Sequence, residues 1–378
     1  MTSPHRLIPS VEGAIDTLLL CLPAALVAGD APIAEALLTT VAPNAHRIVV
    51  THARAARTVS EIGAGNRMTI LSCPDDTPLS VWSQDALISY SGPDDITLAP
   101  SAPAATGTPA RRLFQRLADA GVASIHGEGL PARAGNLLVG DDFVLVGADE
   151  WRRWAAAGPG DNGDDAALAF FQTRIDAHRR PVVVGCGSGR SPGPSRRFKG
   201  PDGQRWRENR EPGVVERGSL QPAYHTDLYA TLAGRSEAGR SRVVVGDLTA
   251  AARSCGSAAP PDRAAEFDAV AAFLDTAGFD VTRCPLALIA RDDPEHRQRH
   301  WFFASWNNAL VEDAGRGGRR VFLPVYGDLG SIDLTAADEC ACAAWTSFGY
   351  QVVAIPGLHG LARMGGGLHC AAKVLRRS

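Results

Sequence analysis

A repeated order of secondary-structure elements constrains the fold of this chain most strongly. Three segments each combine an amphipathic helix, a glycine and an apolar strand that ends at Pro or Gly: residues 113–127, 266–285 and 336–356. Gly278 and Gly349 are about 70 residues apart, and Gly121 lies about twice that distance upstream of Gly278. The spacing indicates a repeat, although the ordinary succession of helices and strands in an α/β protein explains it equally well.

Pairs of apolar runs between these helices predict antiparallel hairpins. Residues 136–139 and 143–146 flank the turn sequence Gly140-Asp141-Asp142, and residues 309–311 and 320–325 flank a glycine-rich turn. Further strands are expected at residues 16–27, 46–51, 68–72 and 86–90. Because the order strand, strand, helix, strand recurs, the expected class is α/β with mixed sheets.

Two stretches fall outside this pattern. Gly92 to Pro109 is rich in Pro, Ala, Ser and Thr, which predicts an exposed loop. Gly185 to Leu220 is dominated by Gly, Pro and charged residues and is longer. A loop of this length without periodicity is either a lid over a functional site or a solvated surface loop, and both interpretations stay open.

Length and charge limit the class of protein. The 378 residues suggest two or three domains at roughly 150 residues each. Hydrophobic residues at 45% and charged residues at 21% suit a soluble globular protein and exclude a disordered or collagen-like chain. A formal charge of -3 supplies no basic field for nucleic acid or an anionic membrane, so we expect a small-molecule partner.

The N-terminal region and the cysteines predict a cytoplasmic protein. The apolar stretch from Leu18 to Gly29 is shorter than the roughly 20 residues of a membrane span. Glu12 and Asp16 stand where a signal peptide would carry basic residues. Eight cysteines are too sparse for a disulfide framework and show no zinc spacing, so no metal site is predicted.

Cys370 has a context unlike that of the other cysteines. It follows Gly365-Gly366-Gly367-Leu368-His369, and three glycines allow the backbone to approach a ligand closely. A thiol just beyond them would lie at the floor of that site. Since neighbours in a strand point to opposite faces, His369 is not expected to be the base that activates Cys370. A buried structural cysteine is the alternative.

Two further segments carry acid and base groups. In Gln221-Pro222-Ala223-Tyr224-His225-Thr226-Asp227, an extended backbone would place His225 and Asp227 on one face, which pairs a proton carrier with an anion. In Trp82-Ser83-Gln84-Asp85, an acid follows an aromatic residue just before an expected strand. Taken singly, Asp85 is explained equally well as a helix cap and His225 as a satisfied structural histidine.

Together these segments resemble the pentein superfamily of guanidine-modifying enzymes, which includes arginine and agmatine deiminases, dimethylarginine dimethylaminohydrolases and arginine amidinotransferases. The family's aromatic-x-x-Asp, His-x-Asp and glycine-rich His-Cys motifs correspond here to Trp82–Asp85, His225–Asp227 and Gly365–Cys370. The run Trp306-Asn307-Asn308 before a strand also resembles the family's penultimate unit. The resemblance implies one domain over residues 1–378, a five-bladed α/β propeller of ββαβ units with loop insertions near 92–109 and 185–220.

The chain departs from the family's hydrolases at one position. Those enzymes have an acid directly before a Gly-Gly-Asp or Gly-Gly-Asn sequence, whereas the matching stretch here is Arg133-Ala134-Gly135-Asn136. Amidinotransferases have Arg-Ala-Gly with an aspartate three residues earlier, but Leu130 stands there in this chain. Glu128 is the nearest acid. Either Glu128 substitutes, or the site works without the acid, or catalysis has been lost.

The resemblance implies a set of roles. Asp85 and Asp227 would hold a guanidinium group, Cys370 would attack its carbon, and His225 would transfer protons. Substrate contacts are expected for Asp85, Asp227, Trp82, Asn307, Arg133 and Glu128. No cofactor or metal is required. Hydrolysis of arginine or a small derivative is the first hypothesis, amidino transfer to an amine the second, and a catalytically silent binding protein the third. The oligomeric state is open, a homo-oligomer included.

Overall fold

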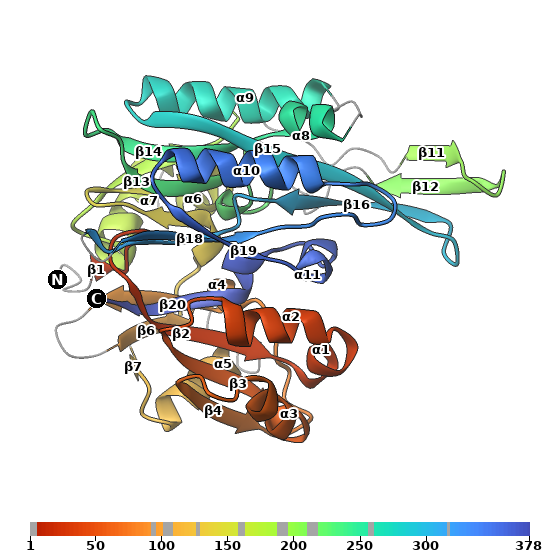
Figure 1. Cartoon of the computed structure of the whole chain (residues 1–378). Coiled ribbons are helices and arrows are strands. Elements are labelled where there is room, and N and C mark those ends of the chain that lie inside the picture. Colours follow the sequence, from red (N-terminus) through yellow and green to blue (C-terminus); the bar gives the residue numbers. More distant parts are fainter. Residues whose placement is uncertain are drawn as a thin grey trace.

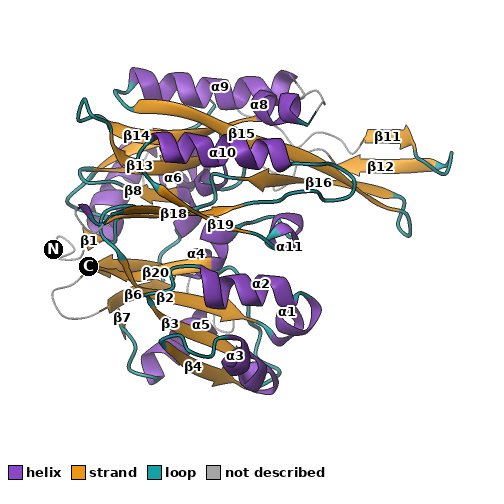
Figure 2. Cartoon of the chain, in the orientation of Figure 1, coloured by secondary structure: helices purple, strands orange, loops and turns teal. Residues whose placement is uncertain are grey.

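The computed structural model describes residues 6–91, 96–100, 109–125, 129–157, 163–186, 196–209, 218–255, 261–315 and 318–378. Their strands form five sheets. In four of these sheets an antiparallel pair of strands is followed along the chain by helical structure and a parallel strand, and in the fifth the antiparallel partner of β2 is β20, the last strand of the chain. Figures 1 and 2 show helices packed on the outer faces of these sheets. The predicted α/β class with mixed sheets is therefore confirmed.

The first two sheets contain the two chain ends. One has the strand order β20-β2-β3-β4 and the other β1-β5-β6-β7. Their elements are β1 (Arg6–Leu7), β2 (Ile15–Leu22), α1 (Ala24–Gly29), α2 (Ala31–Glu35), β3 (His46–His52), α3 (Ala56–Ile62), β4 (Met68–Cys73), α4 (Ser83–Ala86), β5 (Leu87–Ser91), β6 (Ile96–Pro100), α5 (Pro109–Asp119), β7 (Ser124–Ile125) and β20 (Ala372–Arg377).

The other three sheets follow in chain order. They have the strand orders β10-β9-β8, β11-β12-β16-β15-β14-β13 and β17-β18-β19. Their elements are β8 (Leu137–Val139), β9 (Phe143–Gly147), α6 (Ala148–Ala157), α7 (Gly163–Phe170), β10 (Arg180–Val184), β11 (Arg196–Lys199), β12 (Arg205–Asn209), β13 (Ala230–Arg235), β14 (Ser241–Asp247), α8 (Leu248–Ser254), α9 (Pro261–Thr276), β15 (Asp280–Asp293), β16 (Gln298–Ser305), β17 (Leu310–Asp313), β18 (Arg319–Pro324), α10 (Thr335–Ser347), β19 (Gln351–Ile355), α11 (His359–Arg363) and α12 (Leu368–Ala371).

The ends of the helices follow the sequence pattern. Helices α9 and α10 are followed by Gly278 and Gly349, which have φ angles of 94° and 81°. Only glycine adopts such a left-handed conformation without strain, so these residues end the helices and turn the chain into β15 and β19. The expected hairpins β8–β9 and β17–β18 are also present and antiparallel.

The last strand of the chain closes the first sheet. Strand β20 runs antiparallel to β2, so residues 372–377 lie beside residues 15–20. Beyond β20, Ser378 and Ala14 also exchange backbone hydrogen bonds of 3.0 and 3.1 Å, at the end of the chain marked C in Figure 1. This pairing brings α12, which directly precedes β20, against α4. Two motifs that lie almost 300 residues apart in the sequence are therefore neighbours in space.

Three local predictions were wrong. Residues 24–27, expected as the end of the strand 16–27, lie in α1 because the strand ends before Pro23, which has no N–H to donate to the sheet. Ile96–Pro100, expected in a loop, forms β6 beside β5. The long segment 185–220 contains the hairpin β11–β12, which extends the largest sheet by parallel pairing with β16.

Charged residues hid this hairpin in the sequence. Phe198 and Trp206 are flanked by arginine and lysine. Each strand therefore contains a single apolar residue, which is too few to show the alternation typical of a strand. In the structure their rings lie 6.2 Å apart, and Trp206 is buried. Figure 1 shows β11 and β12 projecting from the body of the molecule. Among the described helices, none is both long enough and apolar enough to cross a membrane.

Candidate active site

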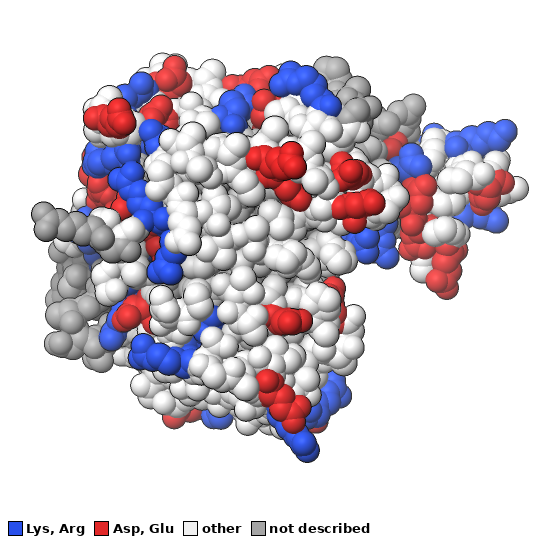
Figure 3. Space-filling model, in the orientation of Figure 1, with Lys and Arg blue, Asp and Glu red and all other residues white. Residues whose placement is uncertain are grey.

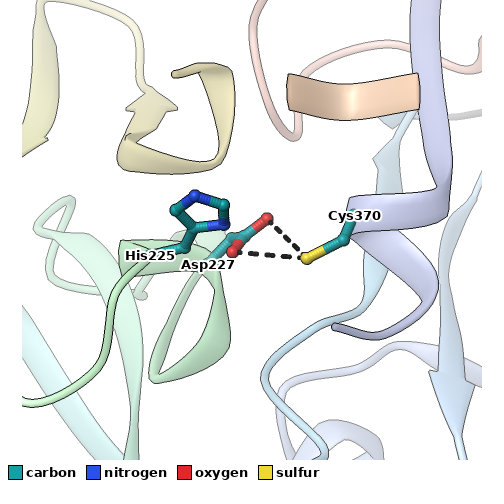
Figure 4. Close-up of side chains that lie close together, drawn as sticks. All are labelled: His225, Asp227 and Cys370. Atoms are coloured by element: carbon teal, nitrogen blue, oxygen red, sulfur yellow. Dashed lines mark hydrogen bonds between the residues drawn. The ribbon is translucent and has the colours of Figure 1, made fainter. Parts of the chain in front are cut away.

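Three distant segments of the chain meet at one place. Asp85 lies on α4, His225 and Asp227 lie at a short 3-10 turn before β13, and Cys370 lies on α12. One ligand atom each of His225, Asp227 and Cys370 lies within 4.8 Å of the others. Figure 4 shows the carboxylate of Asp227 directed at the sulfur of Cys370. The structure thus brings together the four residues predicted to carry the chemistry.

The contacts of Asp227 and Asp85 define the geometry. The two carboxylate oxygens of Asp227 lie 3.5 and 3.7 Å from Cys370 Sγ. Asp85 Oδ2 lies 3.3 Å from His225 Nδ1, an ionic contact when the imidazole is protonated. The other oxygen of Asp85 accepts a hydrogen bond of 3.0 Å from the backbone N–H of Gly135. Two carboxylates, an imidazole and a thiol therefore surround one small space.

His369 departs from the sequence prediction. Residues 368–371 form a helical turn instead of a strand, so neighbouring side chains need not point to opposite faces. His369 Nδ1 lies 2.8 Å from Asp227 Oδ2, the same carboxylate that faces Cys370. His369 thus contacts Asp227, and it affects Cys370 through this shared carboxylate.

Asn308 holds Cys370 from two directions. Its Nδ2 donates to Cys370 Sγ at 3.2 Å, and its Oδ1 accepts from the backbone N–H of Cys370 at 3.1 Å. The same Nδ2 donates to the backbone carbonyl of Asp227 at 3.1 Å. The sequence predicts a substrate contact for Asn307, whereas its neighbour Asn308 is the residue that contacts the thiol.

Asn307 has a different environment. Its side chain is buried, and both of its polar atoms have no hydrogen-bond partner within the described residues. A Cβ atom at Gly246 would lie 3.3 Å from its Nδ2, so the amide is beside the end of β14. A substrate contact for Asn307 stays a prediction.

Gly135 and Asn136 complete the frame of the site, and sequence analysis missed their part in it. A Cβ atom on Gly135 would lie 2.9 Å from Asp85 Oδ1, 3.0 Å from His225 Nδ1 and 3.2 Å from Asp227 Oδ2. Asn136 Oδ1 accepts hydrogen bonds of 3.0 Å from Thr226 N and from the Gln221 side chain. The 3-10 turn that carries Asp227 is therefore tied to the chain segment that carries Gly135.

The three glycines before Cys370 pack closely against side chains of the protein, and the close approach to a ligand expected from the sequence stays a prediction. A Cβ on Gly366 would lie 2.4 Å from the ring of Trp82, and one on Gly367 would lie 2.7 Å from Asn308 Oδ1. A Cβ on Gly365 would lie 2.9 Å from the Tyr224 hydroxyl. Trp82 therefore packs on the glycine run, and its predicted contact with substrate stays a prediction.

Arg133 and Glu128 were the uncertain positions of the sequence analysis. Arg133 directly precedes the turn Ala134–Asn136, and its charge acts on the buried carboxyl group of Glu150. Burial raises the pKa of Glu150, whereas Arg153 and Arg133 lower it. Arg133 thus has an acidic neighbour in the structure. Glu128 lies outside the described residues.

Burial controls the ionisation of the thiol. It raises the pKa of Cys370 well above the ordinary value, and the negative charges of Asp227 and Asp85 raise it further. Hydrogen bonds from the Gly367 backbone and from Asn308 act in the opposite direction. A cation placed between the carboxylates would offset part of their negative charge and favour the thiolate.

Lys373 lies behind this site and was not singled out in the sequence. It is one of only two lysines in a chain with 38 Lys and Arg residues. The side chain is buried, and a cavity of about 40 Å³ separates it from β1 and the residues after it. Burial lowers the pKa of its ammonium group to about 7, while Asp85 and Asp227 act in the opposite direction.

The donor atoms also define what else the site could hold. Nitrogen, oxygen and sulfur atoms from His225, Asp227 and Cys370 form a set that suits a divalent ion such as zinc. The same atoms suit nucleophilic catalysis with a base and an acid. The absence of a metal or cofactor stays a prediction of the sequence.

Comparison with known proteins identifies the fold. No family model matches the chain, and no curated protein matches its sequence. An agmatine deiminase structure from C. jejuni with substrate bound is similar at a TM-score of 0.64 and 11% identity, over 99% of this chain and 97% of that one. An agmatine deiminase of Enterococcus faecalis is similar at a TM-score of 0.60 and 12% identity, over 99% of this chain and 96% of that one.

These similarities extend over nearly the whole of each chain. The mixed α/β fold is therefore similar to that of these deiminases, and the fold class implied by the motif resemblance is confirmed. At 11 and 12% identity the similarity carries fold and not chemistry. The chemistry of this chain depends on the residues of its own site.

Proposed function

We propose that this protein hydrolyses the guanidine group of a small arginine derivative through a covalent intermediate on Cys370. The observation that carries the proposal is the meeting of Asp85, His225, Asp227 and Cys370 around the backbone of Gly135. Each residue comes from a motif that has another explanation when it stands alone. A chance meeting of an acid pair, a base and a nucleophile in one buried space is a poor account of all four.

Substrate binding follows from charge and shape. A guanidinium group is planar and cationic, and carboxylates bind its N–H groups in pairs. Asp85 and Asp227 supply such carboxylates on two sides of the space beside Gly135. Gly135 has no side chain, so a flat group can lie against its backbone. The bound cation then lowers the pKa of Cys370, which the carboxylates otherwise raise.

The chemical steps use groups already in contact. The thiolate of Cys370 attacks the guanidinium carbon, which forms a C–S bond and a tetrahedral adduct. His225 donates a proton to the departing nitrogen, and ammonia or an amine leaves as the C–N bond breaks. His225 then accepts a proton from water, whose oxygen attacks the same carbon. Breaking the C–S bond releases the product and restores the thiol.

The arrangement of the chain accounts for a site built from such distant segments. We propose that the five sheets are the blades of one propeller and that residues 1–378 form a single domain. Closure of the first sheet by β20 supports this arrangement, since it joins the end of the chain to its beginning. Five units in 378 residues give about 76 residues each, near the spacing of about 70 between Gly278 and Gly349.

Amidino transfer is the second candidate. The sequence Gly365-Gly366-Gly367-Leu368-His369-Cys370 and the run Arg133-Ala134-Gly135 favour it. The covalent intermediate on Cys370 would be the same, and an amine would replace water in the second step. The two reactions therefore differ in the acceptor alone, and an added amine distinguishes them.

The third hypothesis, a catalytically silent binding protein, is based on Arg133, whose positive charge would repel a guanidinium. Because the charge of Arg133 acts on the buried Glu150 carboxyl group, part of its field is compensated. The contacts of Asn308 with Cys370 and Asp227 also form a frame that a binding protein would not need. These observations favour the catalytic proposal.

A product assay tests the proposal. The purified protein is incubated with arginine, N-α-benzoyl-arginine or agmatine, with and without glycine as an amine acceptor. In the absence of glycine, hydrolysis releases either ammonia and a ureido product, or an amine and urea. Product formed only with glycine would support transfer instead. Mass spectrometry of acid-quenched protein should detect an amidino group on Cys370. No turnover of any of these compounds, with no adduct on Cys370, would refute the proposal.

A further inference from the structure

A large cavity adjoins the site beside the hairpin of β15 and β16. We call it the tail cavity; its volume is about 380 Å³. It is lined by the end of β15, the start of β16, the end of α11 and the next two residues, together with Tyr224 and Leu228. Figure 3 shows that the molecule is hollowed below the projecting strands, with Lys and Arg side chains at the upper rim.

Tyr224 connects the tail cavity to the reacting groups. Its ring meets the ring of His225 edge-on, with centroids 4.8 Å apart. Burial raises the pKa of the Tyr224 hydroxyl, and the charges of Cys370, Asp227 and Asp85 raise it further, which requires all three to be near. A guanidinium held by Asp227 would therefore direct the rest of its molecule past Tyr224 into the tail cavity.

The charges of the tail cavity favour an anion. Arg291 and Arg363 line it, and neither guanidinium has an ion-pair partner within the described part of the chain. The acid in the lining, Asp293, is already engaged by His296, whose Nδ1 lies 2.9 Å from its carboxylate. Arginine side chains bind carboxylates through paired hydrogen bonds. The cavity therefore offers two cations to a carboxylate on the substrate.

The apolar surface of the cavity indicates a second group. Phe302 is buried in its wall, whereas Met364 is 51% exposed at its rim. Methionine is flexible and polarisable, which suits contact with ligands of varied shape. The cavity volume also falls in the range of roughly 300–1,000 Å³ that accommodates drug-sized molecules. It is larger than the α-carboxylate and amino group of free arginine require.

We propose that the tail cavity binds the far end of the substrate and that the substrate is an arginine acylated on its α-amino group with its carboxylate free. This inference rests on the proposed guanidine chemistry of the site. The carboxylate pairs with Arg291 and Arg363, and the acyl group packs on Phe302 and Met364. Both N-acylated arginine and a peptide that ends in arginine have this chemistry.

Binding to a variant without the nucleophile tests the proposal separately from turnover. Calorimetry with Cys370→Ala compares N-α-benzoyl-arginine with N-α-benzoyl-agmatine, which has the same guanidine and acyl groups but no carboxylate. We expect the acid to bind on the order of ten- to a hundredfold more tightly, as charge-assisted hydrogen bonds allow. A third ligand, the peptide Gly-Gly-Arg, distinguishes a peptide end from a small acylated arginine.

Variants of the cavity sharpen the test. Arg363→Gln and Arg291→Gln, each combined with Cys370→Ala, should weaken binding of benzoyl-arginine and leave benzoyl-agmatine unchanged. Arg57→Gln on α3 is the matched control, since its side chain is 90% exposed in an ion pair with Glu61. Equal affinity for the acid and its decarboxylated analogue would overturn the proposal. If the preference appears without any turnover, the cavity is as proposed and the catalytic proposal fails.

A second inference concerns Lys373 and comes from a different part of the molecule. The chain uses arginine for nearly all its basic residues, yet places one of its two lysines in a buried strand beside the site. Unlike arginine, lysine can lose its proton in a protein. Among the described residues, no hydrogen bond or ion pair holds the Lys373 ammonium group. The charges that act on it are those of Asp85 and Asp227.

We infer that Lys373 is a positioning residue, whose ammonium group balances the charges of Asp85 and Asp227 from behind. It then competes with the substrate cation and assists ionisation of the thiol. The other titratable groups around it are Cys370 and His369 on α12 and Arg377 on its own strand. Like the first, this inference rests on the proposed guanidine chemistry.

Opposite changes in binding and turnover test this role. Lys373→Met should lower KM severalfold, because the aspartates bind the substrate cation more tightly, and lower kcat severalfold, because the thiol ionises less readily. Lys373→Arg keeps its charge, so its kcat should not decline as the wild-type ammonium group loses its proton near pH 7. Lys199→Met, an exposed position on β11, is the matched control.

Binding again separates the two proposals. Calorimetry of methylguanidine should give tighter binding to Lys373→Met combined with Cys370→Ala than to Cys370→Ala alone. Lys373→Gln replaces Lys373→Met if the latter does not fold. Equal affinity in the two backgrounds, or a KM that stays constant or rises while kcat falls, would leave Lys373 a structural residue and overturn the inference.

Discussion

The two sides of Asp227 differ in how their polar groups are satisfied. On the reacting side, Cys370 is held by hydrogen bonds with Asn308 and by close packing of the glycine backbone before it. On the rear side, His369 contacts the same carboxylate, but the nearby ammonium group of Lys373 has no hydrogen-bond partner among the described residues. One side is a rigid frame and the other holds a buried charge.

This difference teaches what each side contributes. A rigid frame supplies geometry, because a nucleophile held near its target loses little entropy at the moment of reaction. A buried charge changes the electrostatic potential at the site, and this effect is strong because the dielectric constant there is low. Burying the charge also lowers the stability of the fold. Substitutions on the reacting side should therefore affect turnover most, and substitutions on the rear side should affect stability and its dependence on pH.

Loss of the nucleophile should have the largest effect. Cys370→Ala removes the atom that forms the covalent bond, so turnover should fall by roughly 10³-fold or more. Initial rates of ammonia release measure it, and circular dichroism verifies that the fold is retained. The exposed Cys340→Ala on α10 serves as control and should keep full activity. Unchanged turnover in Cys370→Ala would exclude a covalent role for this thiol.

The sequence predicted the reacting side better than the rear side for a physical reason. Asp85, His225 and Cys370 lie in short motifs, and their residue types alone indicate an acid, a base and a nucleophile. Gly135 and Asn136 act through backbone contacts with segments about 50 and 90 residues away, which no local pattern encodes.

Lys373 and the strand positions were hidden in a similar way. In a strand with alternating environments, one lysine looks like a solvent-facing residue. Its burial depends on α4, which packs against β20 only in the folded chain. Strands β11 and β12 were missed because their exposed faces are charged. Local pattern thus predicted the elements with continuous apolar periodicity and failed where tertiary packing decides.

Adding one methyl group to the glycine run should break the frame. Gly366→Ala places a Cβ 2.4 Å from the ring of Trp82, so the backbone before Cys370 must shift. We expect a loss of about 1–3 kcal/mol in the free energy of unfolding. Turnover should fall by about 10²-fold, the effect of displacing a catalytic group by about 1 Å.

Urea unfolding and steady-state kinetics measure the two effects of Gly366→Ala. Gly29→Ala is the matched control, because nothing lies within 4 Å of its added Cβ atom. If Gly366→Ala retains wild-type kinetics, the close approach of this backbone to Trp82 does not position Cys370.

Removing the Asn136 side chain should loosen the 3-10 turn with a smaller effect. Asn136→Ala leaves the N–H of Thr226 and the amide of Gln221 without their acceptor in a buried region. Leaving such groups unsatisfied costs about 1–3 kcal/mol in stability. Turnover should decline by roughly tenfold, because Asp227 and His225 lie on the same segment. As a control, Asn44→Ala at an exposed position should change neither stability nor turnover. An Asn136→Ala variant equal to wild type in both would show that the 3-10 turn does not depend on the Asn136 side chain.

The rear side should respond least in turnover and most clearly in the pH dependence of stability. The pKa of Lys373 is about 7 in the folded chain, against an ordinary value of 10.5. A group whose pKa is lowered on folding costs stability below the folded pKa, and this cost disappears as pH rises to the unfolded value. Lys373→Met should therefore raise the melting temperature at pH 6, and the difference in melting temperature from wild type should shrink between pH 7 and 10.

Lys199→Met should show no such trend, since that side chain is exposed. A difference that stays constant from pH 6 to 10 would mean that Lys373 does not change its charge in this range. If the trend appears as expected, the chain retains a destabilising charge beside its aspartates, which is the mark of a residue kept for its effect on the site.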